Sequence, residues 1–193
     1  MTKTIFLVMD MMNDLVAEDG ANAKTYGAQV KERDVLEHTA AALGAAREAG
    51  VPIGYVRVGF SPDYREAPDN SPIFSGAKKN GIFQLGTQGT EVHPALAPQQ
   101  HDHDIVKHRV SPFYSTRLEA ILRANRIERI VMAGVSTNGV VHSGARDARD
   151  RDYEVVILQD CCAGATADEH EHALACLDRY GKIMDNTDFD WGS

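Results

Sequence analysis

Cysteine is scarce in this sequence, and its placement excludes a disulfide-stabilised fold. Three cysteines occur among 193 residues, Cys161, Cys162 and Cys176, all in the last quarter of the chain. An odd number gathered in one region is not a disulfide framework, and adjacent cysteines rarely bridge each other. Unpaired thiols of this kind are typical of a reducing compartment, so we expect a cytoplasmic protein.

Long apolar runs and basic runs are also missing. No stretch of about 18 apolar residues occurs, which excludes a membrane-spanning helix. The first apolar run, Ile5–Met9, is short and ends at Asp10, so we expect no signal peptide. The chain has 20 Lys and Arg against 28 Asp and Glu, a net charge of −8. This acidity argues against nucleic acid or an anionic membrane as a partner, while a local cationic pocket for an acidic substrate stays compatible with it.

The remaining composition, 43% hydrophobic and 25% charged, is that of a globular protein. The length fits one domain over residues 1–193 with a sizeable core. Residues 59–100 stand out as an irregular stretch, rich in Gly, Pro, Ser and Asn, that is too long for a passive connection. We expect this segment to shape a pocket or a subunit interface; a disordered loop is the alternative.

Short β-rich runs alternate with helical patterns along the chain. Six runs predict strands at residues 5–9, 52–58, 104–107, 127–135, 153–158 and 182–184. Helical periodicity predicts helices at residues 34–49, 116–124, 136–149 and 167–180, the first ended by Gly50. This alternation is typical of a three-layer α/β/α Rossmann-like sandwich, in which a mostly parallel six-stranded sheet has helices on both faces.

Residues that could take part in catalysis stand at the ends of the predicted strands. Asp10 ends the first predicted strand, Lys107 ends the third, and Val135-Ser136-Thr137 connects the fourth to a helix. Parallel sheets bind ligands beyond the carboxyl ends of their strands, so we expect an acid, a base and a turn to meet in one crevice. Because the sequence has neither Gly-x-Gly-x-x-Gly nor a Walker A pattern, it offers no support for nucleotide binding.

Three segments, in this order, resemble a known family. Asp10-Met11-Met12-Asn13-Asp14 is similar to the Asp-Met-Gln-Asn-Asp segment of the isochorismatase-like hydrolases, a superfamily shared with nicotinamidases and other cysteine amidohydrolases. Lys107-His108-Arg109-Val110-Ser111-Pro112-Phe113 resembles the family's lysine segment. Gly134-Val135-Ser136-Thr137-Asn138-Gly139-Val140-Val141 resembles its Gly-Val-x-Thr-x-x-Cys-Val motif. The resemblance covers nearly the whole chain.

Val140 stands where amidohydrolase members of that family carry their nucleophilic cysteine. A valine side chain has no lone pair and no acidic proton, so it cannot form an acyl-enzyme. The resemblance leaves the isochorismatase type of chemistry open, in which an aspartate protonates the enol carbon of a vinyl ether and water completes the hydrolysis. Ser136, Thr137 and Ser143 are the alternatives for a nucleophile, but no motif places a histidine base beside them.

The resemblance also implies roles for the residues at the crevice. Asp10 would be the general acid or base, and Lys107 would orient it and hold a substrate carboxylate. A cis peptide bond is implied at Val135–Ser136, with an oxyanion hole formed by the backbone N–H groups of Ser136 and Val140. As an acid, Asp10 needs a proton at neutral pH, so burial must raise its pKa against the opposing effect of Lys107. A turn cap and a surface lysine are the ordinary alternatives for this pair.

Aromatic residues near the expected crevice are candidates for substrate contact. We expect Phe60, Phe113 and Thr137 to bind substrate, with Tyr64 and Phe83 as further candidates for an aromatic wall. A place in the core is the alternative for the aromatic side chains.

Cysteine and histidine offer little support for a metal or a reactive thiol. Cys161 and Cys162 are expected at the crevice rim just after the fifth strand, where buried packing is the usual role of cysteine. The side chains of His101-Asp102-His103 have zinc-ligand chemistry, although we interpret the segment as a solvated loop. Val58-Gly59-Phe60 lacks the metal-binding Asp-x-His of the nicotinamidase branch, so we expect no metal and no other cofactor.

The sequence supports functions from different classes. The first is a cysteine-independent hydrolase of the isochorismatase type that acts on a small, anionic molecule, with Asp10 and Lys107 as its acid–base pair. The second is a catalytically inactive family member that binds a small molecule or another protein. The third is an amidohydrolase that uses another nucleophile. Since members of the family are commonly dimers or larger, the resemblance implies a homodimer or a larger homo-oligomer.

Overall fold

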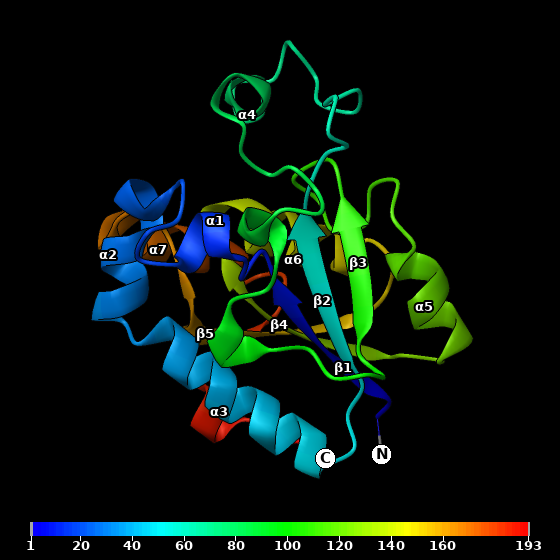
Figure 1. Cartoon of the computed structure of the whole chain (residues 1–193). Coiled ribbons are helices and arrows are strands. Elements are labelled where there is room, and N and C mark those ends of the chain that lie inside the picture. Colours follow the sequence, from blue (N-terminus) through cyan, green and yellow to red (C-terminus); the bar gives the residue numbers. More distant parts are fainter. Residues whose placement is uncertain (1, 193) are drawn as a thin grey trace.

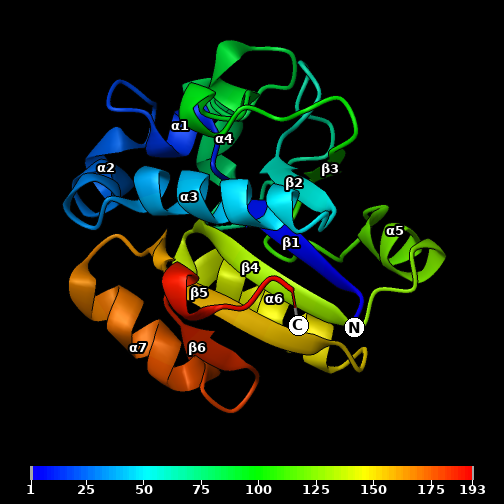
Figure 2. The same cartoon turned by 90° about the horizontal axis from the view of Figure 1, so that it is seen from below.

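A parallel sheet forms the middle of the computed structural model, which describes residues 2–192. Its six strands lie in the order β3-β2-β1-β4-β5-β6, and all neighbours are parallel (Figures 1 and 2). The strands are β1 (Thr4–Met9), β2 (Ile53–Val58), β3 (His103–Lys107), β4 (Arg129–Val135), β5 (Glu154–Ala163) and β6 (Lys182–Met184). The predicted fold class is confirmed, and the sheet is wholly rather than mostly parallel.

Helices cover both faces of this sheet and produce the three layers seen in Figure 2. One face carries α1 (Asn13–Val16), α2 (Ala23–Glu32) and α3 (Val35–Glu48). The other carries α5 (Leu118–Ala124), α6 (His142–Arg149) and α7 (Ala167–Leu177). Along β1, Phe6 and Val8 pack into the first core and Ile5 and Leu7 into the second. A strand between two helical layers needs apolar residues on both faces, which explains the unbroken apolar run.

The end of α3 follows the sequence prediction. Gly50 follows the C-cap residue Ala49 with a φ of 71°, a left-handed conformation that glycine adopts without steric cost. The chain then enters β2 at Ile53.

Several elements differ from the prediction. The first, second and fourth helices were not predicted, and α2 shows why: only Gln29 and Val30 are buried among its 10 residues, so its apolar periodicity is weak. The helix expected over residues 136–149 begins as one turn of π-helix, Thr137–Val141, before α6. Strand β5 continues to Ala163, so Cys161 and Cys162 lie buried inside the strand and not at the crevice rim.

The segment between β2 and β3 forms a folded lobe above the carboxyl ends of these strands (Figure 1). It contains α4 (Ser75–Asn80) and two short 3-10 turns, Gln88–Thr90 and Pro94–Leu96. Its return path is fixed to the sandwich because the backbone N–H of Phe83 donates to Asp14 Oδ2 at 2.8 Å. Four residues of this lobe, Ile73, Phe74, Ile82 and Phe83, line the cavity described below. None of the helices in residues 2–192 is both long and apolar enough to cross a membrane.

Candidate functional site

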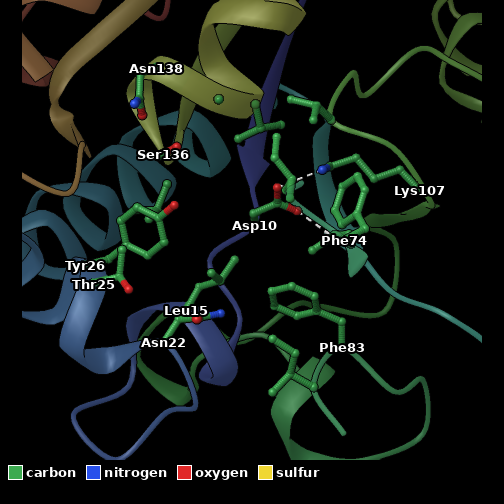
Figure 3. Close-up of a pocket in the computed structure, with 17 residues that line it drawn as sticks. Asp10, Leu15, Asn22, Thr25, Tyr26, Phe74, Phe83, Lys107, Ser136 and Asn138 are labelled. Carbon is green, nitrogen blue, oxygen red and sulfur yellow. Dashed lines mark hydrogen bonds and ion pairs between the residues drawn. The ribbon is translucent and has the colours of Figure 1, made fainter. Parts of the chain in front are cut away.

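A cavity of about 430 Å³ lies beyond the carboxyl ends of the strands, next to the boundary between β1 and β4. At this boundary the strand order reverses, because β2 and β3 extend the sheet on one side of β1 and β4 to β6 extend it on the other. In open parallel sheets this reversal of strand order creates the crevice in which ligands bind. The lining comes from the ends of β1 to β4, from α1 and α2, from the lobe and from the turn after β4 (Figure 3). A cavity of this size accepts a small molecule.

Asp10 lies at the floor of the cavity. It follows the last residue of β1 with a φ of 56°, a conformation in which aspartate is enriched, and this turns the chain out of the sheet. Its Oδ1 accepts a hydrogen bond from the backbone N–H of Val58 at 2.9 Å, and its Oδ2 lies 2.8 Å from Lys107 Nζ. The residue is 5% exposed. The sequence prediction that Asp10 and Lys107 meet in one crevice is confirmed.

Lys107 reaches Asp10 across the end of β2. Strand β2 lies between β1 and β3, and Val58 is the register partner of Lys107. The side chain of Lys107 is 2% exposed, and its Nζ also donates to the carbonyl of Arg109 at 3.0 Å. An ammonium group so buried is held by its two oxygen partners, so Lys107 is not a surface lysine.

The environment of Asp10 sets its protonation. Burial raises the pKa of this carboxyl above its ordinary value, while the charge of Lys107 and the hydrogen bonds from Lys107 and Val58 act in the opposite direction. The net direction is upward because loss of solvation is the larger effect. The protonated form, which a general acid requires, is therefore more accessible than in an exposed aspartate.

The turn after β4 forms another wall of the cavity. The peptide bond between Val135 and Ser136 is cis, as the resemblance implied. Val135, Ser136 and Val140 line the cavity, together with Asn138 and Gly139. Val140 is 3% exposed and its side chain packs into the second core. The position at which the resemblance places a cysteine nucleophile thus faces the cavity, and it carries a hydrocarbon.

The rest of the lining divides into two sides. Asn22, Thr25 and Tyr26 of the α2 region lie across the cavity from Phe74 and Phe83 of the lobe (Figure 3). Among the described residues that line the cavity, Lys107 is the one cationic side chain and Asp10 the one carboxylate. A ligand here meets neutral hydrogen-bonding groups on one side, aromatic rings on the other, and the ion pair between them.

Most of these wall residues were not predicted, and the reasons are physical. Residues 22–26 lie at the start of a helix whose apolar pattern is too weak to detect. Phe74 and Ile73 belong to the irregular lobe, whose path no periodicity specifies. Of the aromatic residues considered from the sequence, Phe83 does line the cavity.

The three substrate-binding predictions differ from the structure, since none of these side chains lines the cavity. Phe60 is fully buried behind Phe74, with ring centroids 5.6 Å apart, and supports that wall from inside the core. Phe113 packs in the core of the opposite face, over Tyr153. Thr137 is fully buried and hydrogen bonds to His170.

Tyr64, the other aromatic candidate, also lies outside the lining, with its hydroxyl donating to the carbonyl of Ile82 at 2.9 Å. Asp102 of the His-Asp-His segment pairs with Arg47 at 2.9 Å. Within residues 2–192, no group of three or more His, Cys, Asp or Glu side chains is arranged to hold a metal ion. None of the three cysteines lines the cavity.

Sequence comparison agrees with this geometry. Residues 4–188 match the model of the isochorismatase domain. The chain belongs to the isochorismatase family. It is 34% identical to the ureidoacrylate amidohydrolase RutB of Methylorubrum extorquens over 170 residues, 81% of this chain and 68% of that protein. It is 36% identical to the uncharacterized isochorismatase family protein YecD of Escherichia coli O157:H7 over 132 residues, 66% of each. This isochorismatase-family chain thus spans about two thirds of the length of these curated relatives.

Solved structures show the same fold. An isochorismatase family protein from Desulfovibrio vulgaris superposes with a TM-score of 0.86 at 23% identity, covering 97% of this chain and 96% of that one. The nicotinamidase PncA of Bacillus subtilis superposes with a TM-score of 0.78 at 25% identity, covering 95% and 100%. Family membership and these named relatives place the chain among the hydrolases in general.

Proposed function

We propose that this isochorismatase-family protein hydrolyses a small molecule in the cavity without forming a covalent enzyme intermediate. Asp10 is the general acid and base, and Lys107 is its partner. The observation that carries the proposal is the buried Asp10–Lys107 ion pair, 2.8 Å long, in a cavity whose described lining contains no thiol. Acid–base chemistry needs such a pair and no nucleophilic side chain, whereas an acyl-enzyme mechanism needs the group that Val140 lacks.

In the proposed reaction the Asp10 carboxyl acts twice, first as an acid and then as a base. Protonated Asp10 donates its proton to the substrate, on the enol carbon when the substrate is a vinyl ether, and the adjacent carbon becomes electrophilic. Water adds to that carbon and returns its proton to the Asp10 carboxylate, after which the adduct collapses to a carbonyl compound and an alcohol. Lys107 stabilises the carboxylate between the two transfers. Proton transfer by a positioned side chain contributes roughly 10²- to 10⁴-fold to a rate.

The pair also favours an anionic substrate. When Asp10 holds its proton, Lys107 becomes a buried cation without a countercharge, and a substrate carboxylate that reaches it supplies that charge. The same carboxylate raises the pKa of Asp10, so an anionic ligand promotes the protonated form that the first step needs. On the opposite wall, the backbone N–H groups of Ser136 and Val140 are proposed to stabilise negative charge on a substrate oxygen.

The test is a hydrolysis screen of the purified protein against isochorismate, related vinyl ethers and small amides. Asp10→Asn keeps the shape of the side chain and removes the acid, so we expect turnover of a vinyl ether to fall at least about 100-fold. The matched control is Asp19→Asn, the same substitution at an exposed residue outside the cavity, which we expect to leave turnover unchanged. Circular dichroism and thermal unfolding check that each variant is folded.

Each outcome has one meaning. Turnover that persists within threefold in Asp10→Asn refutes the role of Asp10. Ammonia release from an amide by the wild-type protein refutes the cysteine-independent vinyl-ether chemistry. If the folded wild-type protein binds a panel compound but turns over none of them, the proposal of an enzyme is refuted and an inactive binding protein is favoured.

A further inference from the structure

The turn that lines the cavity is held from behind by the first turn of α7. The two segments lie 33 residues apart in sequence where Thr137 meets His170. On the cavity side, Ser136, Asn138, Gly139 and Val140 face the ligand space. On the far side, Thr137 turns away from the cavity and toward α7, so this turn has one face for the ligand and one for the helix.

The contact between Thr137 and His170 is fully enclosed. Thr137 is 0% exposed and His170 is 1% exposed, and Thr137 Oγ1 lies 2.8 Å from His170 Nδ1. The Nε2 atom of His170 has no hydrogen-bond partner among the described residues. The imidazole therefore makes its one directional side-chain contact with the turn, and a buried hydroxyl that lost this contact would stay unsatisfied.

The neighbouring residues repeat the arrangement. Asn138 Nδ2 donates to Glu169 Oε2 at 3.1 Å, and the same carboxylate oxygen accepts from the backbone N–H of Ala165 at 3.3 Å. Glu169 is itself fixed, since its backbone N–H donates to the capping hydroxyl of Thr166 at 3.1 Å. Two consecutive residues of α7 thus bind two consecutive residues of the turn, which fixes both its position and its rotation.

Burial keeps the imidazole neutral. It lowers the pKa of His170 to about 4, and the positive charge of Arg33 acts in the same direction. A neutral imidazole has one donor and one acceptor nitrogen, and a threonine hydroxyl can donate or accept, so the hydrogen bond between Thr137 Oγ1 and His170 Nδ1 can form in either tautomer. The contact is therefore intact at neutral pH.

We propose that His170 and Glu169 are positioning residues, which hold Thr137 and Asn138 from α7 and so fix the wall formed by residues 136–140. Neither side chain lines the cavity, so both act through the turn. The inference rests on the proposed function, because this wall carries the N–H groups assigned to the substrate oxygen. A displacement of the turn by about 1 Å is enough to reduce catalysis strongly while the remaining walls still bind ligand.

Two substitutions of His170 separate positioning from simple filling of space. His170→Leu retains the bulk of the residue and removes the hydrogen bond to Thr137. His170→Asn places an amide atom at the position of Nδ1 and retains a partner for the hydroxyl. The matched control is His172→Leu, the same change on the exposed side of α7.

The experiment measures amide hydrogen exchange of the protein without ligand, comparing a peptide over residues 136–142 with peptides from β1 and β4. In His170→Leu we expect exchange in the turn to become at least tenfold faster relative to exchange in the strands. We expect nearly wild-type exchange in His170→Asn and in His172→Leu. With a substrate from the hydrolysis screen, we expect kcat of His170→Leu to fall while its KM stays unchanged. We expect His170→Asn to have nearly the kcat of the wild type.

Exchange in the turn that is unchanged in His170→Leu, or that rises only in proportion to exchange in β1 and β4, overturns the proposal and leaves a purely structural histidine. If His170→Leu does not fold, Thr137→Val removes the same hydrogen bond from the other side and has the same expected result. Because the exchange measurement needs no substrate, its outcome is independent of whether the protein proves to be a hydrolase.

Discussion

The strongest quantitative test of the site is the removal of Lys107. In Lys107→Met the Asp10 carboxylate, whose side chain is 7% exposed, loses a cation 2.8 Å away and keeps only the N–H of Val58 as a partner. Breaking a buried ion pair from one side costs about 3–5 kcal/mol because the remaining charge is uncompensated. The matched control is Lys31→Met: Lys31 pairs with Glu18 at 3.2 Å, but both side chains are at least 80% exposed. An exposed pair of this kind is worth less than about 1 kcal/mol.

The loss of unfolding free energy in Lys107→Met should depend on pH in a defined direction. In Lys107→Met the two effects of Lys107 that lower the pKa of Asp10 are gone, and the burial that raises it remains. A carboxyl whose folded-state pKa lies above its unfolded-state value stabilises the fold at low pH, and this stabilisation is lost as the pH rises through the folded-state pKa. We therefore expect the deficit of Lys107→Met relative to wild type to be small near pH 5 and largest near pH 8 (about 3–5 kcal/mol).

Urea unfolding followed by circular dichroism measures the free energy of unfolding of both variants and of the wild type at the two pH values. The double variant Asp10→Asn/Lys107→Met contains no buried charge at this site, so it should be more stable than Lys107→Met alone at pH 8. A loss below about 1 kcal/mol at pH 8, or a loss of equal size at both pH values, would falsify the argument that Lys107 compensates a buried carboxylate.

Two further predictions concern His170 and Val140. The pKa of His170 is lowered from 6.5 to about 4, so the unfolded chain takes up the proton first and stability falls by up to about 3 kcal/mol as the pH drops from 6.5 to 4. In His170→Leu, urea unfolding over this range should lack this contribution to the pH dependence of the unfolding free energy. A pH dependence equal to that of the wild type would contradict the lowered pKa. In Val140→Cys the new thiol faces the cavity, so mass spectrometry should find it alkylated by iodoacetamide in a Cys176→Ser background, while the buried Cys161 and Cys162 react slowly. A thiol as inert as those two would show that residue 140 is closed to ligands.

The sheet and the residues of the Asp10–Lys107 ion pair were predictable from sequence because both depend on local patterns. Unbroken apolar runs such as Ile5–Met9 specify strands buried on two faces, and alternation with helices specifies their parallel order. Parallel direction then puts Asp10 and Lys107 at the same edge of the sheet although they stand 97 positions apart, and the strand order, with only β2 between β1 and β3, lets them meet. The family resemblance of three segments added the cis bond between Val135 and Ser136.

The walls of the cavity depended on contacts that no local pattern encodes. Phe60 and Phe74 are both lobe aromatics, yet only Phe74 faces the cavity, because the path of the lobe puts Phe60 behind it. Ser136 and Thr137 are adjacent hydroxyl residues, yet one lines the cavity and the other is buried against His170.

The sequence by itself determined which segments form strands, that these strands are parallel and which residues stand at their ends, because the patterns behind these features extend over a few residues at a time. Only the tertiary structure decided which side chains surround the ligand space and that α7 holds the turn after β4. Those choices result from packing between segments far apart in the chain, where the space left by one segment determines which way a side chain of another can point.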